Sequence, residues 1–347
     1  MCTGLTLKSL DGAVVFGRTM EWGTFDLASR VIIYPRGTQF TAHTPALKAG
    51  FTWKGQYGFV GLDAPAMSEG IVLDGMNEKG LSVNGFYLPG FTEYQVFDPA
   101  EVEISMGPGD VVPYLLSSAS TVEQAKAALA KVRVTPVVAP MLGMAPPGHW
   151  IVTEPSGKAM VVEYVKGELV TFDAPLGVIT NAPNYDWHMI NLRNFINLSP
   201  VALPTRRIEE IDFAPLGGGS GMIGLPGDNT PPSRFVRAVA FSRTARPTPT
   251  GEETIYEIFR MLDNFNLPLG AAEGEGVAKT KGMRSSTIWT TAYDTRNMTL
   301  HYHTQHNRRV RKVALNKIDF GTLREPVIVP LDKAKEQDIE DVTPTLN

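Results

Sequence analysis

Short apolar segments bounded by turn-forming residues fill the first hundred positions of the chain. Residues 3–7 alternate polar and apolar side chains, Gly12 favours a turn, and a second apolar run begins at Val14. Two such runs joined by a short turn are typical of a β-hairpin, so we expect residues 3–7 to pair with residues 14–20. The same pattern predicts further strands at 30–34, 58–62, 71–73 and 81–86.

Helical patterns appear only later in the chain. The run Thr121-Val122-Glu123-Gln124 has the form of a capping box and predicts a helix over residues 125–132. Apolar residues at helical spacing predict a helix over 252–262, and residues 185–196 are also predicted to be helical. Strands are expected again at 150–153, 159–164, 169–172, 287–293, 298–303 and 310–315.

This order of strands, helices, strands, helices and strands predicts the fold class. It lacks the strict alternation of a parallel doubly wound fold. An α+β fold, with antiparallel sheets that carry helices on their outer faces, fits the order best. We see no internal repeat and no linker. We therefore expect one domain over residues 1–331 and a polar, peripheral tail at 332–347.

Composition and charge narrow the function. The 347 residues are 43% hydrophobic and 20% charged, as expected for a globular protein, and the net charge of −4 argues against nucleic acid as a partner. No apolar run has the length of a membrane span, so we expect no membrane partner. The N-terminus lacks the basic and apolar regions of a signal peptide. We expect a cytoplasmic protein, or a periplasmic one if a signal peptide had been trimmed ahead of Cys2.

Cys2 is the only cysteine of the chain and directly follows Met1. A single cysteine excludes an intrachain disulfide and a multi-cysteine metal site. Removal of Met1 would give Cys2 both a thiol nucleophile and a free α-amine, which is the pair that covalent amide hydrolysis requires. The α-amine titrates near pH 8, so it is a much better base at neutral pH than a lysine. The alternative for a lone cysteine is a small buried apolar residue.

The predicted hairpin brings two charged residues close to Cys2. Arg18 and Glu21 lie on or just after the strand expected to pair with residues 3–7. Arg18 could stabilise a thiolate and Glu21 could hold the α-amine. From spacing alone, a surface ion pair between the two is the simpler interpretation.

Several motifs, in order over about two thirds of the chain, resemble the choloylglycine hydrolase family. That family includes conjugated bile salt hydrolases and penicillin V acylases. The matching runs are Met1-Cys2-Thr3-Gly4-Leu5-Thr6-Leu7, Phe16-Gly17-Arg18-Thr19-Met20-Glu21-Trp22, Asp74-Gly75-Met76-Asn77-Glu78-Lys79-Gly80-Leu81, Thr180-Asn181-Ala182-Pro183-Asn184-Tyr185-Asp186-Trp187, Gly224-Leu225-Pro226-Gly227-Asp228 and Pro232-Ser233-Arg234-Phe235.

The resemblance implies a cysteine N-terminal nucleophile hydrolase with an αββα sandwich, a small acyl amide as substrate, no cofactor and a homotetramer. It implies that Cys2 is the nucleophile with its own amine as base, and that Arg18 sits by the sulfur. By the same resemblance Glu21 contacts the amine and Asn181 donates its side-chain amide to the oxyanion. The backbone N–H of Tyr87 would donate to the same oxyanion, and Arg234 would support the polar network.

Two positions depart from the common family pattern. The acidic position is commonly Asp, whereas this chain has Glu21, whose carboxylate is displaced by about one bond length. Tyr87 resembles the penicillin V acylases, where many bile salt hydrolases have Asn. The run from Thr19 to Trp22 resembles a branch of the family in which some members also cleave acyl-homoserine lactones. Penicillin V-like amides or conjugated bile salts are the expected substrates, with acyl-homoserine lactones as the alternative.

We expect an apolar wall around the acyl group, because pockets of this kind are lined by aromatic and aliphatic side chains. The candidates are Met20, Trp22, Phe59, Phe86 and Met141, the last with its neighbours up to Met144. Ordinary core packing is the alternative for each, above all for Met20 and Phe59.

Two other functions remain open at this point. His301, His303 and His306 suggest a metal-dependent hydrolase, but no carboxylate motif accompanies them, so we expect no metal. A non-catalytic ligand-binding protein that keeps the fold and retains Met1 is the other alternative, and Glu21 is the residue that allows it.

Overall fold

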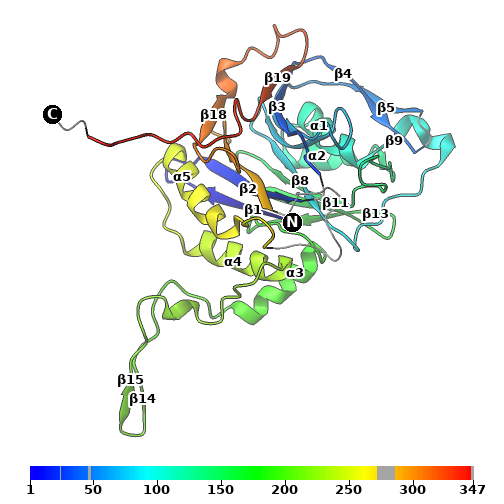
Figure 1. The fold of residues 1–347 in the computed structure, drawn as a ribbon. Coiled ribbons are helices and arrows are strands. Elements are labelled where there is room, and N and C mark those ends of the chain that lie inside the picture. The colour runs from blue at the N-terminus through cyan, green and yellow to red at the C-terminus, as the bar shows by residue number, and fades with distance from the viewer. Residues whose placement is uncertain (24, 46–47, 272–285, 345–347) are drawn as a thin grey trace.

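The computed structural model of the protein describes residues 1–23, 25–45, 48–271 and 286–344. Its two main β-sheets lie face to face, with helices outside each (Figure 1). Within the described residues, none of the helices has the length and apolar character needed to cross a membrane.

The smaller of the two main sheets carries the N-terminus. Its five antiparallel strands run in the order β1 (Cys2–Lys8), β2 (Val14–Trp22), β16 (Ser286–Asp294), β17 (Thr299–Thr304) and β18 (Arg311–Ala314). The predicted hairpin is confirmed: β1 pairs with β2, with Cys2 opposite Met20 and Gly4 opposite Arg18. This sheet therefore combines two strands from the start of the chain with three strands from its last third.

The larger sheet has eight antiparallel strands. Their order is β13 (Glu168–Asp173), β12 (Ala159–Val165), β11 (Gly148–Thr153), β8 (Ser82–Tyr87), β7 (Val72–Asn77), β6 (Phe59–Asp63), β3 (Arg30–Tyr34) and β19 (Val327–Pro330).

Helices cover the outer face of each sheet. Helices α4 (Pro231–Thr244) and α5 (Gly251–Leu262) pack on β1, β2 and β16, and α3 (Tyr185–Asn191) lies against α4. Helices α1 (Val111–Ser118) and α2 (Val122–Leu129) pack on β7, β8 and β11. These layers confirm the α+β prediction and the αββα sandwich that the resemblance implies.

The remaining elements are short. They are the strands β4 (Gln39–His43), β5 (Ala49–Lys54), β9 (Ser105–Met106), β10 (Arg133–Val134), β14 (Arg206–Ile208) and β15 (Ile211–Phe213), and the 3-10 helices η1 (Pro99–Ile104), η2 (Pro108–Asp110), η3 (Leu192–Phe195), η4 (Ser220–Met222), η5 (Asp263–Phe265) and η6 (Leu315–Lys317).

A glycine close to Cys2 lets the two sheets approach each other. A Cβ on Gly4 would lie 2.7 Å from ring atoms of both Phe16 and Phe86, and 3.0 Å from the Ile179 side chain. Gly4 also exchanges two backbone hydrogen bonds with Ile179. The missing side chain therefore allows β1 to lie close to β8 of the other sheet and next to the segment that follows Ile179.

Local sequence signals predicted some helices and missed others. The Thr121 side chain caps α2 by accepting from the Gln124 N–H, as predicted, although the helix begins at Val122. Helix α1 was missed because seven of its eight residues are buried, so no polar face marks its period. Helix α4 was missed because it opens on two prolines, Pro231 and Pro232.

The division into one domain and a tail stays a prediction. Residues 333–344 run along the surface away from the two sheets (Figure 1) and are mostly exposed. An ion pair of 2.8 Å joins Arg309 to Asp338, and Asp332, at the start of the tail, pairs with Arg311 at 2.6 Å.

Candidate active site

Cys2 begins β1, so its position is fixed by the edge of the smaller sheet. The side chain is buried, with 3% of its surface exposed. Its Sγ lies 2.9 Å from Nη2 of Arg18 and 3.5 Å from Sδ of Met20. A cation at this distance stabilises negative charge on sulfur, which is the reactive form of a cysteine.

Arg18 is fully buried between the two sheets. Its Nη1 donates to the carbonyl oxygen of Gly85 at 2.7 Å, and its Nη2 also reaches Sδ of Met20 at 3.1 Å. The guanidinium lies over the rings of Phe86 and Trp289, 4.5 and 5.1 Å from their centroids. Aromatic faces attract a cation and exclude water from it, so the charge is held in one place beside Cys2.

Asp74 of β7 balances this buried charge. Burial raises the pKa of its carboxyl to about 6, and the charge of Arg18 opposes that rise. Its Oδ2 accepts from Thr291 Oγ1 at 2.9 Å, while its Oδ1 has no hydrogen-bond partner among the described residues. Asp74 lies in one of the family motifs, but the motif indicates no role for it, since the charge of Arg18 acts on this carboxyl only when the sheets pack.

Asn181 and Arg234 bind the backbone of Cys2. The Cys2 N–H donates to Oδ1 of Asn181 at 2.9 Å, and Nη2 of Arg234 donates to the same oxygen at 2.7 Å. Nη1 of Arg234 donates to the Cys2 carbonyl oxygen and to Thr3 Oγ1. Burial lowers the pKa of Arg234 to about 10, so the group remains a cation at neutral pH.

Glu21 does not contact the Cys2 nitrogen directly. Its carboxylate accepts from Thr287 Oγ1 at 2.7 Å, and burial raises its pKa, against the charges of the Met1 amine and Arg234. Met1 extends β1: its amine donates to the Glu21 carbonyl oxygen at 3.1 Å, and its own carbonyl accepts from the Glu21 N–H. With Met1 in place, Asn181 rather than Glu21 holds the Cys2 nitrogen.

An apolar cavity of about 90 Å³ opens on Cys2. Its lining includes three of the residues expected there, Met20, Trp22 and Phe86, and also Tyr87. Further lining residues were not predicted from the sequence; they include Met1, Met67, Ile71, Leu73, Val112, Pro147 and Trp150. They come from strands, loops and a helix far apart in the chain, so no local pattern marks them.

The chain matches known proteins over nearly its whole length. Residues 2–329 match the family model of the linear amide C–N hydrolases, choloylglycine hydrolase family. The chain belongs to this family. It is 32% identical over 321 residues to a bile salt hydrolase/transferase of Clostridium perfringens, covering 91% of this chain and 93% of the relative.

Solved structures agree. A conjugated bile acid hydrolase from Clostridium perfringens superposes with a TM-score of 0.83 at 26% identity, over 99% of this chain and 100% of that one. A penicillin V acylase from Agrobacterium tumefaciens gives a TM-score of 0.72 at 22% identity, over 97% and 95% of the two chains, which shows a common fold. The protein is thus a linear amide hydrolase of the choloylglycine hydrolase family.

Two predicted wall residues lie elsewhere. Phe59 is fully buried on the outer face of the larger sheet, where it packs against Tyr34 with ring centroids 4.9 Å apart. Side chains alternate along a strand, so its neighbour Val60 faces the space between the sheets instead. Met141 is 51% exposed and lines neither of the cavities near Cys2. Neither residue therefore lines the cavity at Cys2.

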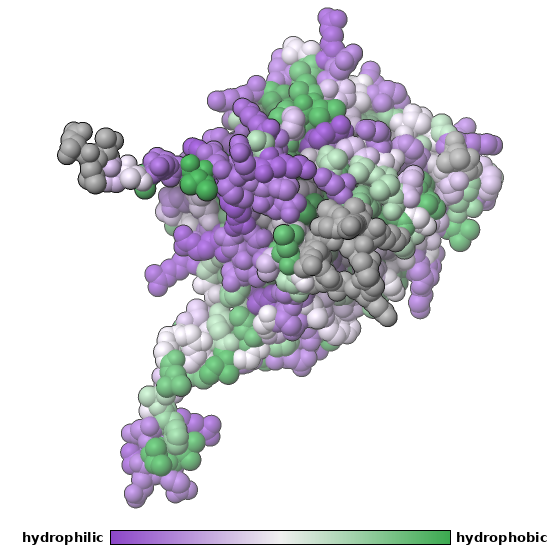
Figure 2. Space-filling model, viewed as in Figure 1, coloured by the Kyte–Doolittle hydropathy of each residue, from purple (hydrophilic) through white to green (hydrophobic). Residues whose placement is uncertain are grey.

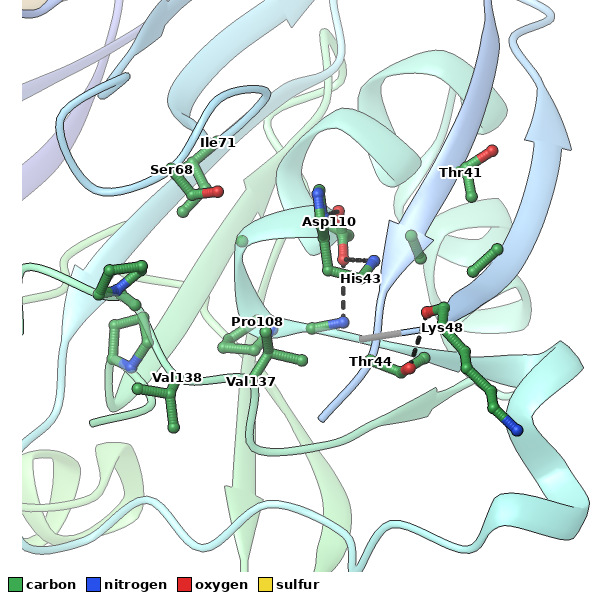
Figure 3. A pocket seen from close by; sticks show the side chains of 17 residues that line it. Thr41, His43, Thr44, Lys48, Ser68, Ile71, Pro108, Asp110, Val137 and Val138 are labelled. Carbon is green, nitrogen blue, oxygen red and sulfur yellow. Dashed lines mark hydrogen bonds and ion pairs between the residues drawn. The ribbon is translucent and has the colours of Figure 1, made fainter. Parts of the chain in front are cut away.

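A second, larger cavity of about 430 Å³ adjoins the first (Figure 3). Ile71, Pro108, Gly109 and Pro146 line both cavities. In the larger one, Asp110 accepts from the His43 backbone N–H at 3.1 Å, and its other oxygen lies 3.4 Å from Nδ1 of the same residue. This contact with Asp110 raises the pKa of His43.

The histidines considered for a metal do not gather. His301 and His303 are buried on β17, where burial lowers the pKa of each to about 4. In the described part of the chain, no group of three or more His, Cys, Asp or Glu residues is placed to hold a metal ion. The metal-dependent alternative gains no support from this arrangement.

The raised pKa of Asp74 predicts a pH dependence of stability. The folded carboxyl titrates near pH 6 and the unfolded one near 3.8, so the folded state binds more protons between these values. The free energy of unfolding therefore falls as pH rises through this window, by about 3 kcal/mol from this group. Asn does not titrate, so between pH 4 and 7 we expect the melting temperature of Asp74→Asn to fall less than that of the wild type.

Thermal melts over this pH range measure the difference in slope. The exposed Asp186→Asn is the matched control and should follow the wild-type curve. Parallel curves for Asp74→Asn and wild type would contradict the assignment, whatever the absolute stability of the variant.

Proposed function

We propose that the protein hydrolyses an acyl amide through the thiol of Cys2 after Met1 has been removed. One observation carries this proposal: Cys2 lines an apolar cavity, its sulfur lies within hydrogen-bond distance of Arg18, and its nitrogen lies within hydrogen-bond distance of Asn181. Membership in a family of linear amide hydrolases agrees with it.

In this mechanism the free α-amine of Cys2 accepts the thiol proton. The thiolate, beside Arg18, attacks the amide carbonyl and forms a tetrahedral intermediate. The proton passes to the leaving amine as the C–N bond breaks, which leaves the acyl group on Cys2 as a thioester. Water then attacks the thioester, and the sulfur takes back a proton as the acid departs.

Asn181 and Tyr87 are the proposed oxyanion donors. Nδ2 of Asn181 donates to the Tyr87 carbonyl oxygen at 2.6 Å. In the proposed complex the oxyanion of the substrate would accept this hydrogen bond in place of the Tyr87 carbonyl. Backbone groups alternate sides along an antiparallel strand. The Leu88 N–H donates to the Pro147 carbonyl oxygen, so the N–H of Tyr87 points to the opposite side of β8, the side on which Asn181 lies. The β7–β8 pairing ends at Asn84, so β7 does not occupy this N–H.

The experiment combines intact mass with turnover. We expect active protein to lack Met1, Cys2→Ala to be inactive, and Asn181→Ala to lose about 10²- to 10³-fold in kcat with little change in KM, as for a lost oxyanion donor. The exposed Asn194→Ala is the matched control and should keep wild-type kcat.

Two results would contradict the mechanism. Full activity in protein that retains Met1 would exclude the α-amine as base. Absence of any turnover in protein that lacks Met1 would favour the non-catalytic, ligand-binding alternative. Near-wild-type kcat in Asn181→Ala would overturn the oxyanion assignment alone.

For the acyl group, penicillin V-like amides fit the site better than conjugated bile salts. The cavity at Cys2 is small and its wall is aromatic: Trp22 and Tyr87, both of which line it, meet edge to face with ring centroids 6.4 Å apart. A flat or linear acyl group suits this space. The relative named a bile salt hydrolase/transferase keeps conjugated bile salts among the substrates to test. Acyl-homoserine lactones are the third class.

The adjoining cavity extends the space available to a linear acyl chain. We expect kcat/KM to rise from hexanoyl to decanoyl amides of one amine, because each buried methylene contributes about 0.8 kcal/mol. Val138 lines only the second cavity and is 57% exposed, so tryptophan can fill the cavity there. Val138→Trp should remove the gain for decanoyl substrates and leave hexanoyl turnover unchanged.

Initial rates over the series measure this effect. The exposed Val96→Trp, which lines neither cavity, is the control and should keep the wild-type dependence on chain length. An unchanged gain in Val138→Trp would show that the acyl chain takes another path.

The predicted homotetramer also finds support. The β14–β15 hairpin projects from the molecule (Figure 1), and apolar atoms are visible on it (Figure 2). Ile208, Ile211 and Phe213 are exposed on one face, and the ion pair of Arg207 and Asp212 marks the other. An isolated two-stranded hairpin is only marginally stable, so a second copy that covers the apolar face would stabilise it.

We expect the triple substitution Ile208→Ser, Ile211→Ser, Phe213→Ser to reduce the oligomer to smaller species in light scattering. The double substitution Arg207→Ser, Asp212→Ser changes the opposite face and should leave the mass unaltered. A monomeric wild type, or an unchanged oligomer in the triple variant, would contradict this interface.

A further inference from the structure

A histidine and a glutamate form a buried pair behind the proposed oxyanion site. His149 of β11 and Glu163 of β12 are cross-strand neighbours, and their side chains are 2% and 0% exposed. Nδ1 of His149 lies 3.1 Å from Oε1 of Glu163. Neither residue lines the cavity at Cys2 or the adjoining one. The proposed mechanism gives this pair no role, although its burial costs free energy.

Among the described residues, every side-chain hydrogen bond that leaves this pair goes to the segment that carries Asn181. Nε2 of His149 lies 3.3 Å from the Thr180 carbonyl oxygen. Oε1 of Glu163 accepts from the Tyr185 backbone N–H at 3.0 Å, and Oε2 accepts from Nδ2 of Asn184 at 2.8 Å. The pair thus holds residues 180–185 on both sides of Asn181.

A second imidazole completes this support. Nε2 of His188 donates to the carbonyl oxygen of Asn181 itself at 2.9 Å, and its ring stacks on Phe235 with centroids 4.7 Å apart. Burial lowers the pKa of His188 to about 4, so the ring is neutral and Nε2 holds the hydrogen. The carbonyls of Thr180 and Asn181 are therefore both held by ring nitrogens.

The hydrogen-bond inventory shows why a histidine and a carboxyl are both needed. A carbonyl only accepts, so Nε2 of His149 must carry hydrogen. Oε1 and Oε2 of Glu163 each meet another donor. One further proton, shared between Nδ1 of His149 and Oε1 of Glu163, gives each of these nitrogen and oxygen atoms a hydrogen-bond partner. Gln in place of Glu163 has one oxygen instead of two, so the bonds from the Tyr185 N–H and from Nδ2 of Asn184 cannot both persist without a rotation of the Asn184 amide.

We propose that His149 and Glu163 are positioning residues for the amide hydrolysis: they fix the backbone around Asn181 so that its side-chain amide meets the oxyanion. This inference rests on the proposed function of Asn181. Neither residue contacts the sulfur or lines the acyl cavity, and an aromatic ring at position 149 keeps the packing against Phe86. Loss of the pair's hydrogen bonds should therefore impair transition-state stabilisation and spare both substrate binding and thiol reactivity.

The test uses His149→Phe and Glu163→Gln in the full-length protein. Phe keeps an aromatic ring where His149 meets Phe86 edge to face, at 6.2 Å between centroids. We expect kcat to fall about 10- to 100-fold in each variant, since a misplacement near 1 Å costs about 10²-fold. KM and the rate of Cys2 alkylation by iodoacetamide should stay within about twofold of wild type.

Tyr164→Phe is the matched control. Tyr164 follows Glu163 on β12, is fully buried, and its hydroxyl has no hydrogen-bond partner among the described residues. Removal of that hydroxyl should leave kcat at the wild-type value.

Two outcomes would overturn the inference. Unchanged kcat in both variants would show that the pair does not position Asn181. A parallel fall of kcat and alkylation rate would show that the whole site has loosened, which is a structural effect. Failure of the proposed function looks different, because the wild type itself would then show no amide turnover.

Discussion

The guanidinium of Arg18 is a cation held out of water between two β-sheets, and its neighbours compensate for that burial. Removing a charge from water costs several kcal/mol unless polar partners surround it. Here the partners are the Gly85 carbonyl, the rings of Phe86 and Trp289, the carboxyl of Asp74 and the sulfur of Cys2. These groups come from both sheets, so the site exists only when the sheets are packed. The same constraint explains why Gly4 carries no side chain beside Phe16 and Phe86.

Asn181 is the second point on which the site depends. Its side chain meets Cys2, Arg234 and Tyr87, which come from β1, α4 and β8. Buried polar groups are costly when one partner is missing, so such a network holds its members in a single arrangement. Preorganised donors are effective in catalysis for the same reason, because they do not need to reorient as charge develops. The buried His149–Glu163 pair extends this rigidity into the larger sheet.

Sequence reasoning succeeded where short-range patterns or motif matches carry the information. Alternation and the turn at Gly12 predicted the β1–β2 hairpin, and that hairpin alone brings Arg18 and Met20 to Cys2. It did not extend to which of two buried faces of a strand a side chain takes, or to the path of a loop. Phe59 and Val60 are adjacent and apolar, yet only Val60 faces the space between the sheets. Met141 lies in an apolar stretch whose path depends on packing around it.

The sequence by itself determined the single cysteine that we propose as the nucleophile, the hairpin that supports it, the order of strands and helices, and the family. Each of these depends on residues that are neighbours in the chain or on short contiguous motifs. Only the tertiary structure decided that Asp74 balances Arg18, that Asn181 rather than Glu21 holds the Cys2 nitrogen, and that His149 and Glu163 stand behind Asn181. These contacts join residues 14 to 266 positions apart, and their geometry depends on how two sheets and a loop pack together.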